Sequence, residues 1–278
     1  MSAYGQIKRN KIESISRLRP RTYTLPGPSA SLTVFPFQDV LSPGRLALQH
    51  SDRLEPLWNH LSGLFDLIVA EGRTYPQEEL LGLKGFKNYF LSHDIFIGVL
   101  DAFPSSRVTP DFPTFNQEEG FIDEEAETLS MMDLILGRPL EETIAGIYYV
   151  KPNYPGRSSH CCNAGFVVDP RHRGRKIGKT LARSFLHYAP ILGLSLILTQ
   201  LYIFRFEGTG YRASVFNLVY QNNLASIAIW DSLGFQRVGR IPKAGRLRSN
   251  IPSHPTDRGQ SSEDEEYVDA IIYYKEFI

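Results

Sequence analysis

A short basic turn in the sequence carries the residue types that bind a pyrophosphate. It follows an apolar run at residues 163–168 and precedes a segment in which apolar residues recur at helical spacing from Ile177 onward. Gly174 and Gly178 would let a ligand approach the backbone closely, and the N–H groups at the start of a helix lack internal partners. The turn also supplies the cations Arg171, Arg173, Arg175 and Lys176. The pattern predicts a phosphate site, and the alternative is a solvated basic turn.

Two asparagines lie inside apolar runs that are predicted as strands. Asn163 begins the run before the basic turn, and Asn217 lies within residues 214–220. A buried amide without partners costs about 1–3 kcal/mol. Each side chain therefore either bonds the backbone as a structural amide or contacts a ligand, and the residues alone leave both alternatives open.

The apolar runs around these residues predict how they are positioned. Strands are expected at residues 32–37, 95–100, 144–150, 163–168, 214–220 and 268–274. Helices are expected at residues 54–71, 78–91, 177–189 and 224–233. This mixed order predicts a single α/β domain with a largely antiparallel sheet.

That domain is expected to span residues 31–278, after a flexible basic segment at residues 1–30. The segment has a single acid, Glu13, among several lysines and arginines, so an organelle transit peptide is the alternative. Loops are expected at about residues 104–142 and 243–266, because Pro, Ser, Gly and acidic residues bury too little apolar surface to offset the entropy of ordering.

Charge and composition exclude several classes of protein. The 30 basic residues balance the 30 acidic ones, so no whole-chain field favours nucleic acid or an anionic membrane. No apolar run reaches the roughly 18 residues of a membrane span. Cys161 and Cys162, the only cysteines, are adjacent, which argues against a disulfide framework and for a reducing compartment. We expect a cytoplasmic protein without a metal site, and mitochondrial import is the alternative location.

The basic turn resembles the acetyl-CoA motif of the GNAT superfamily of N-acetyltransferases, Arg/Gln-x-x-Gly-x-Gly/Ala after a strand. Arg171 and Gly174 occupy its first two fixed positions, whereas Lys176 stands where a small residue is usual. Further along, the helix that opens at Asn223-Leu224-Ala225-Ser226 and ends at Leu233-Gly234-Phe235 resembles the superfamily's second segment. The resemblance implies a GNAT fold, in which a mixed, mostly antiparallel sheet splays open at the acetyl-CoA cleft and is flanked by helices.

Other stretches are similar to the fungal L-azetidine-2-carboxylate acetyltransferases. In that family's order, they include Thr74-Tyr75-Pro76-Gln77, Val150-Lys151-Pro152-Asn153-Tyr154, Asn163-Ala164-Gly165-Phe166, Phe216-Asn217-Leu218-Val219 and Val268-Asp269-Ala270-Ile271-Ile272-Tyr273. This resemblance implies N-acetylation of proline analogues and related toxic imino acids, by direct attack of the amine on the thioester in a ternary complex. It also implies a homodimer.

The resemblance assigns roles to individual residues. Val168 should donate its backbone N–H to the thioester carbonyl, and Asn163 and Asn217 match asparagines implicated in substrate contact. Asn223 matches a CoA-contacting asparagine and also suits a helix cap. The residues expected to bind acetyl-CoA are Val168, Arg171, Arg173, Gly174, Arg175, Lys176, Ile177, Gly178 and Asn223.

The proton donor for the leaving thiolate is not evident. Many GNAT enzymes use a tyrosine on the second helix, and Trp230 stands at that position, where an indole cannot serve as the acid. His160, Tyr148 and Tyr149 are candidate donors, and a satisfied structural role is the alternative for each. Cys162 is interpreted as a strand residue and not as a nucleophile.

Residues 194–210 have no counterpart in the family and lengthen the link between the first helix and the next strand. One hypothesis is a retained intron in the gene model, which uniform transcript coverage through the segment would contradict. The alternative is a genuine additional strand or hairpin.

The leading hypothesis is therefore an acetyl-CoA-dependent N-acetyltransferase for a small imino or amino acid such as L-azetidine-2-carboxylate. One alternative is an N-acetyltransferase for a different small amine, because acceptor choice depends on few contacts. Another is a non-catalytic acetyl-CoA-binding module, which Trp230 and Lys176 favour and the paired asparagines oppose.

Overall fold

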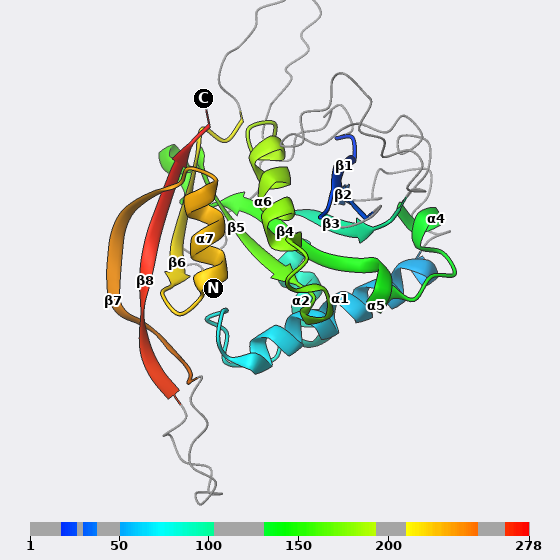
Figure 1. The fold of residues 1–278 in the computed structure, drawn as a ribbon, viewed down its shortest axis with the longest axis horizontal. Coiled ribbons are helices and arrows are strands. Elements are labelled where there is room, and N and C mark those ends of the chain that lie inside the picture. The colour runs from blue at the N-terminus through cyan, green and yellow to red at the C-terminus, as the bar shows by residue number, and fades with distance from the viewer. Residues whose placement is uncertain are drawn as a thin grey trace, which may run out of the picture.

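The computed structural model describes residues 18–26, 30–37, 51–102, 131–192, 210–249 and 265–277. Its strands form one sheet in the order β1-β2-β3-β4-β5-β6-β8-β7 (Figure 1). They are β1 (Arg21–Thr24), β2 (Ser31–Phe37), β3 (Asp94–Leu100), β4 (Ile144–Pro152), β5 (Cys161–Val168), β6 (Ala213–Tyr220), β7 (Gln236–Arg248) and β8 (Glu265–Glu276). Among these strands, the β5–β6 pair is parallel and the other pairs are antiparallel.

Helices cover both faces of this sheet (Figure 1). They are α1 (Ser51–Glu71), α2 (Gly82–Phe90), α4 (Met131–Ile135), α5 (Leu140–Thr143), α6 (Ile177–Tyr188) and α7 (Leu224–Ser232), with short 3₁₀ turns η2 (Gly156–Ser158) and η3 (Pro170–His172). Helices α6 and α7 pack on one face, where Phe185 and Trp230 join the core, and α1 and α2 pack on the other through Phe65 and Phe86. Strand alternation divides the sheet between these two cores: Tyr148 faces α6, and Tyr149 faces α2.

The feature that positions the site is an opening between β5 and β6. The two strands pair only through Cys161 with Ala213 and Cys162 with Ser214, and they diverge over the rest of their length. The predicted GNAT fold, a mixed and mostly antiparallel sheet flanked by helices, is confirmed.

Three expected irregular segments contain regular structure. Strand β1 lies inside the segment expected to be flexible, because Tyr23 is buried and the Thr22 and Thr33 hydroxyls meet at 2.9 Å. Helices α4 and α5 occupy the end of the first expected loop. Residues 243–248 of β7 lie inside the second expected loop, because this exposed part of the strand carries glycine and cations without apolar alternation. These three expectations are wrong for the described residues.

Two sequence predictions fall mainly outside the described residues. The segment at residues 194–210 is described only at Gly210, and of the first expected loop only its last part is described. Within the described part of the chain, no helix is long and apolar enough to cross a membrane.

Candidate active site

A cleft of about 1230 Å³ lies at the opening between β5 and β6. It is lined by the end of α1, the end of β5, the basic turn, the start of α6, most of α7 and the end of β7. Seven of the residues expected to bind acetyl-CoA line it: Val168, Arg173, Gly174, Lys176, Ile177, Gly178 and Asn223. The structure therefore brings the two sequence motifs to one cavity.

The basic turn is built on a buried carboxylate. Asp169 is 1% exposed and accepts from the Arg171 N–H at 2.9 Å, which begins the turn η3. The chain then passes through Gly174 (φ 79°) and Lys176 (φ 61°), both left-handed, before α6 begins at Ile177. The first helical hydrogen bond is Thr180 N–H to Lys176 O at 3.0 Å, so the preceding N–H groups have no acceptor within the helix.

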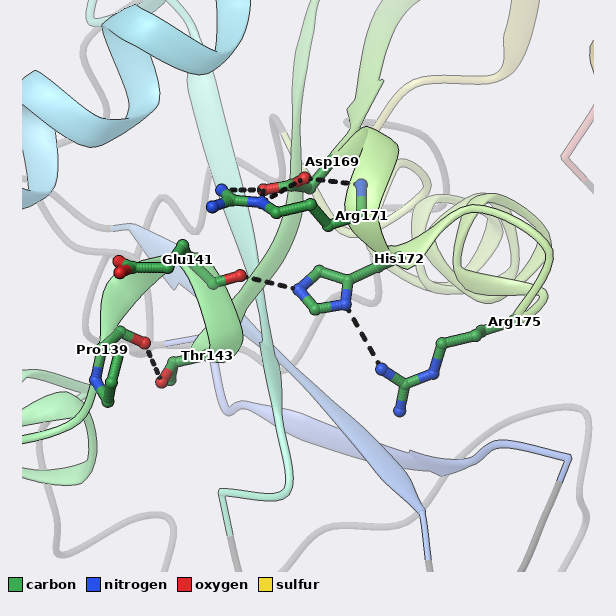
Figure 2. A network of polar contacts seen from close by, with 7 residues as sticks. All are labelled: Pro139, Glu141, Thr143, Asp169, Arg171, His172 and Arg175. Carbon is green, nitrogen blue, oxygen red and sulfur yellow. Dashed lines mark hydrogen bonds and ion pairs between the residues drawn. The ribbon is translucent and has the colours of Figure 1, made fainter.

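Two of the predicted cations belong to the turn and not to the cleft (Figure 2). The Arg171 guanidinium folds back onto Asp169 at 2.6 Å. Burial alone would raise the pKa of Asp169, but the hydrogen bonds from Arg171 outweigh that effect and hold the pKa below its usual value. Arg175 lies 3.3 Å from His172 Nδ1, and His172 Nε2 donates to Glu141 O at 3.0 Å. Arg171 thus fixes the turn to Asp169, and Arg175 contacts the histidine that joins the turn to α5. Neither residue lines the cleft, and their part in cofactor binding stays a prediction.

Three further cations reach the cleft, and two of them, Arg73 and Arg248, come from segments distant in the sequence, so no local motif predicts them. Arg73 follows α1, Lys179 lies in the first turn of α6, and Arg248 ends β7. The Arg248 N–H donates to Gly72 O at 2.9 Å, which joins the end of β7 to the end of α1. Arg173 pairs with Glu71 at 2.9 Å. Together with the open space beside Gly174, these charges fit a ligand with several phosphates.

Helix α7 forms the opposite wall. Asn223 caps it, since its Oδ1 accepts from the Ser226 N–H at 3.1 Å. Trp230 and Ser226 both line the cleft, and the Trp230 Nε1–H donates to the Ser226 hydroxyl oxygen at 2.9 Å. The indole has no acidic proton to give, so Trp230 contributes shape to the cleft and orients Ser226.

The backbone N–H of Val168 faces the opening between the strands. The Asp169 N–H donates to Ala145 O on β4 at 3.0 Å, while Phe166 O accepts from the Tyr75 hydroxyl at 3.2 Å. Because backbone groups alternate between the two edges of a strand, Val168 points the same way as Phe166 and away from β4. The strand β6 has diverged before this level, so a ligand oxygen can approach the Val168 N–H.

On the face of the sheet that packs against α2, several aromatic side chains lie close to this opening. The Tyr149 ring packs directly on Gly165 of the neighbouring strand. A Cβ at this position would come within 2.5 Å of the ring, so any residue other than glycine would displace Tyr149. The Tyr149 and Tyr89 hydroxyls meet at 2.8 Å. Burial raises the pKa of Tyr75, Tyr89 and Tyr149, so these phenols are neutral donors at physiological pH.

The two predicted asparagines have different surroundings. Asn163 lies where β5 and β6 separate, and its Oδ1 accepts from the adjacent Ala164 N–H at 2.8 Å. Asn217 lies at an irregularity of β6 and forms a reciprocal amide pair with Asn153, at 2.7 and 3.1 Å. Tyr154 also donates to Asn217 Oδ1, at 3.3 Å. The Asn217 oxygen is thus engaged, and a ligand would meet its second N–H.

The other candidate groups have structural surroundings. His160 is exposed and its Nδ1 contacts Arg157 O at 3.1 Å. Tyr148 is buried against α6, where the Ser184 hydroxyl donates to it at 3.0 Å. Cys162 is buried, and burial raises the pKa of its thiol, which disfavours a thiolate nucleophile. The described residues contain no cluster of His, Cys, Asp and Glu that could hold a metal ion.

Comparisons with known proteins agree with this site. A family model described as the acetyltransferase (GNAT) family matches residues 99–202. N-acetyltransferase aca1 of Schizosaccharomyces pombe is 34% identical over 211 residues, which cover 72% of this chain and 82% of aca1. A GCN5-related N-acetyltransferase from Kribbella flavida is 20% identical, with a TM-score of 0.52 and coverage of 88% of this chain and 97% of that one. The structure of yncA from Salmonella typhimurium with its cofactor acetyl-CoA is 10% identical, with a TM-score of 0.50 and coverage of 89% and 94%.

The splayed mixed sheet with flanking helices is the fold of these N-acetyltransferases. The chain belongs to the GNAT family of N-acetyltransferases. It is an enzyme that uses acetyl-CoA as the acetyl donor, as the sequence predicted.

Proposed function

We propose that the enzyme acetylates the nitrogen of a small imino or amino acid such as L-azetidine-2-carboxylate, in the detoxification of such analogues. The proposal rests on a set of polar side chains on β5, on β6 and at the end of β4, near the point where β5 and β6 separate. Asn163 lies where the strands separate, and Asn217 on β6 forms an amide pair with Asn153 and accepts a further hydrogen bond from Tyr154. Amide and phenol groups next to the aromatic rings of Tyr89 and Tyr149 suit a small polar molecule with an apolar ring.

The reaction follows from this arrangement. The neutral amine attacks the thioester carbonyl carbon, the C–S bond breaks, and the proton lost by nitrogen ends on the CoA thiolate. The Val168 N–H would stabilise the oxyanion that forms on the carbonyl oxygen, because it faces the opening. Asn163, through its amide N–H groups, and Asn217, through its second N–H, would orient the acceptor. Arg173, Gly174, Lys176, Ile177, Gly178 and Asn223 would hold the cofactor.

Thiol release by the purified chain of 278 residues tests this function. We expect CoA release from acetyl-CoA that depends on L-azetidine-2-carboxylate, and N-acetylated product by mass spectrometry. Asn163→Leu should lower kcat/KM by about tenfold or more, because an oriented hydrogen bond is lost, with Asn59→Leu on α1 as the control. Protein that binds acetyl-CoA by calorimetry but releases no thiol with any imino or amino acid would refute the proposed acceptor class.

A further inference from the structure

Lys151 is a lysine on the acceptor side of the opening for which the mechanism above has no use. It lies on β4 directly opposite Asn163 on β5, so the two side chains share one face of the sheet. Its Nζ is 5.4 Å from the centre of the Tyr149 ring and 5.6 Å from that of Tyr89. The ammonium group therefore lies over the rings of Tyr149 and Tyr89, and its strand β4 is next to β5, the strand that separates from β6.

No carboxylate neutralises this lysine within the described part of the chain. The ion pairs there involve arginines on the basic turn and on β7, and none includes Lys151. The side chain is partly buried, and desolvation lowers the pKa of its ammonium group. A partly buried cation that lies over two aromatic rings and has no ion-pair partner among the described residues is more stable with a bound anion.

Beside Tyr89, a second polar atom also lacks a partner among the described residues. Gln77 Oε1 is buried without a hydrogen-bond partner, while Gln77 also hydrogen bonds the Tyr89 hydroxyl, and Tyr89 lies under the Lys151 ammonium. Tyr89 thus neighbours both a partly desolvated donor cation and a buried acceptor oxygen. A molecule that carries both a carboxylate and an amine would complement the two groups.

We propose that Lys151 binds the carboxylate of the acceptor and makes the enzyme selective for amino and imino acids over plain amines. This inference rests on the proposed acceptor class. The ring of the acceptor would pack on Tyr149, and its nitrogen would lie toward Gln77 Oε1 and the opening. Lys151 contacts the end of the acceptor that does not react, so it determines specificity and takes no part in the proton transfer.

Binding of an unreactive analogue pair tests this site apart from catalysis. Tetrahydrofuran-2-carboxylate has a ring oxygen in place of the amine and cannot be acetylated, and its carboxamide is the neutral counterpart. By calorimetry with acetyl-CoA present, we expect the wild type to bind the carboxylate about tenfold to a hundredfold more tightly than the carboxamide. Lys151→Met should remove this preference, and Lys84→Met, an exposed lysine on α2, should retain it.

The outcomes separate this inference from the proposed function. If the wild type shows no carboxylate preference, or Lys151→Met retains it, the inference is wrong. If the preference depends on Lys151 but L-azetidine-2-carboxylate is not acetylated, the carboxylate site stands and the acceptor is a different amine that bears a carboxylate. Kinetics with L-azetidine-2-carboxylate and its amide give a second readout: Lys151→Met should raise KM for the carboxylate and leave KM for the amide unchanged.

Discussion

Lys176 shows how one residue can carry a cost and a function together. Its backbone is left-handed at φ 61°, a conformation that favours glycine, and it stands where GNAT sequences usually have a small residue. Lys176 lines the cleft, so this residue places a positive charge at the cofactor site at the cost of backbone strain. The usual small residue is thus explained by the turn geometry, and the lysine by the ligand.

Two substitutions at Lys176 separate these effects. Lys176→Gly removes both the strain and the charge, so the free energy of unfolding should rise by about 1 kcal/mol. Lys176→Ala removes the charge and keeps the Cβ, so it should not stabilise the protein. Both should weaken acetyl-CoA binding about twofold to fivefold, since the lost charge is exposed. Denaturant unfolding and calorimetry would measure these changes, and equal stability of the two variants would contradict the strain argument.

At the scale of elements, the sequence predicted what is regular and local. Apolar periodicity located α1, β3, β4 and α6 within a few residues of their observed bounds. It failed for β7, which is largely solvent-exposed, and for β1, whose residues are polar by type although Tyr23 and Thr22 are buried. The basic turn and the cap of α7 could be read from motifs, since each is one contiguous segment. Arg73, Arg248 and Lys151 could not, because only the folded sheet brings their elements to the opening.

The connection between α6 and β6 gives a prediction about an element. On either side of the undescribed residues 193–209, the Tyr211 N–H donates to Leu192 O at 3.2 Å. Deletion of residues 194–210 would leave Gly193 alone between Leu192 and Tyr211. A hydrogen bond across one residue is a γ-turn, which glycine adopts readily. The deleted form should therefore fold, keep its unfolding temperature within a few degrees (about 1 kcal/mol or less), and release thiol from acetyl-CoA.

A control of equal length separates the effect of the length of the connection from the effect of its side chains. Replacing residues 194–210 by a Gly-Ser segment of equal length keeps the reach of the connection and removes its side chains. Activity of the deletion and of this replacement would show that the native segment is dispensable. Loss of folding in both would show instead that the segment contributes contacts of its own.

At the scale of the whole molecule, charge is balanced overall and concentrated locally. The formal net charge is +0, so long-range attraction of an anion is weak. The cleft nevertheless gathers Arg73, Arg173, Lys176, Lys179 and Arg248 from α1, the basic turn, α6 and β7, against the single acid Glu71. Binding of the polyanionic cofactor should therefore depend on short-range charges that this one cleft assembles.

The affinity for acetyl-CoA should therefore depend on the salt concentration. Raising the ionic strength from about 0.05 to about 0.5 M shortens the screening length from about 14 to about 4 Å, so acetyl-CoA binding should weaken about tenfold. Arg248→Gln should bind acetyl-CoA more weakly at low salt and show a shallower salt dependence, because one of the screened charges is gone. Arg157→Gln, an exposed arginine of η2 outside the cleft, should behave like the wild type. Calorimetric affinity that is independent of salt, or an Arg248→Gln slope equal to that of the wild type, would show that backbone donors at the start of α6 and apolar contacts hold the cofactor without the distant cations.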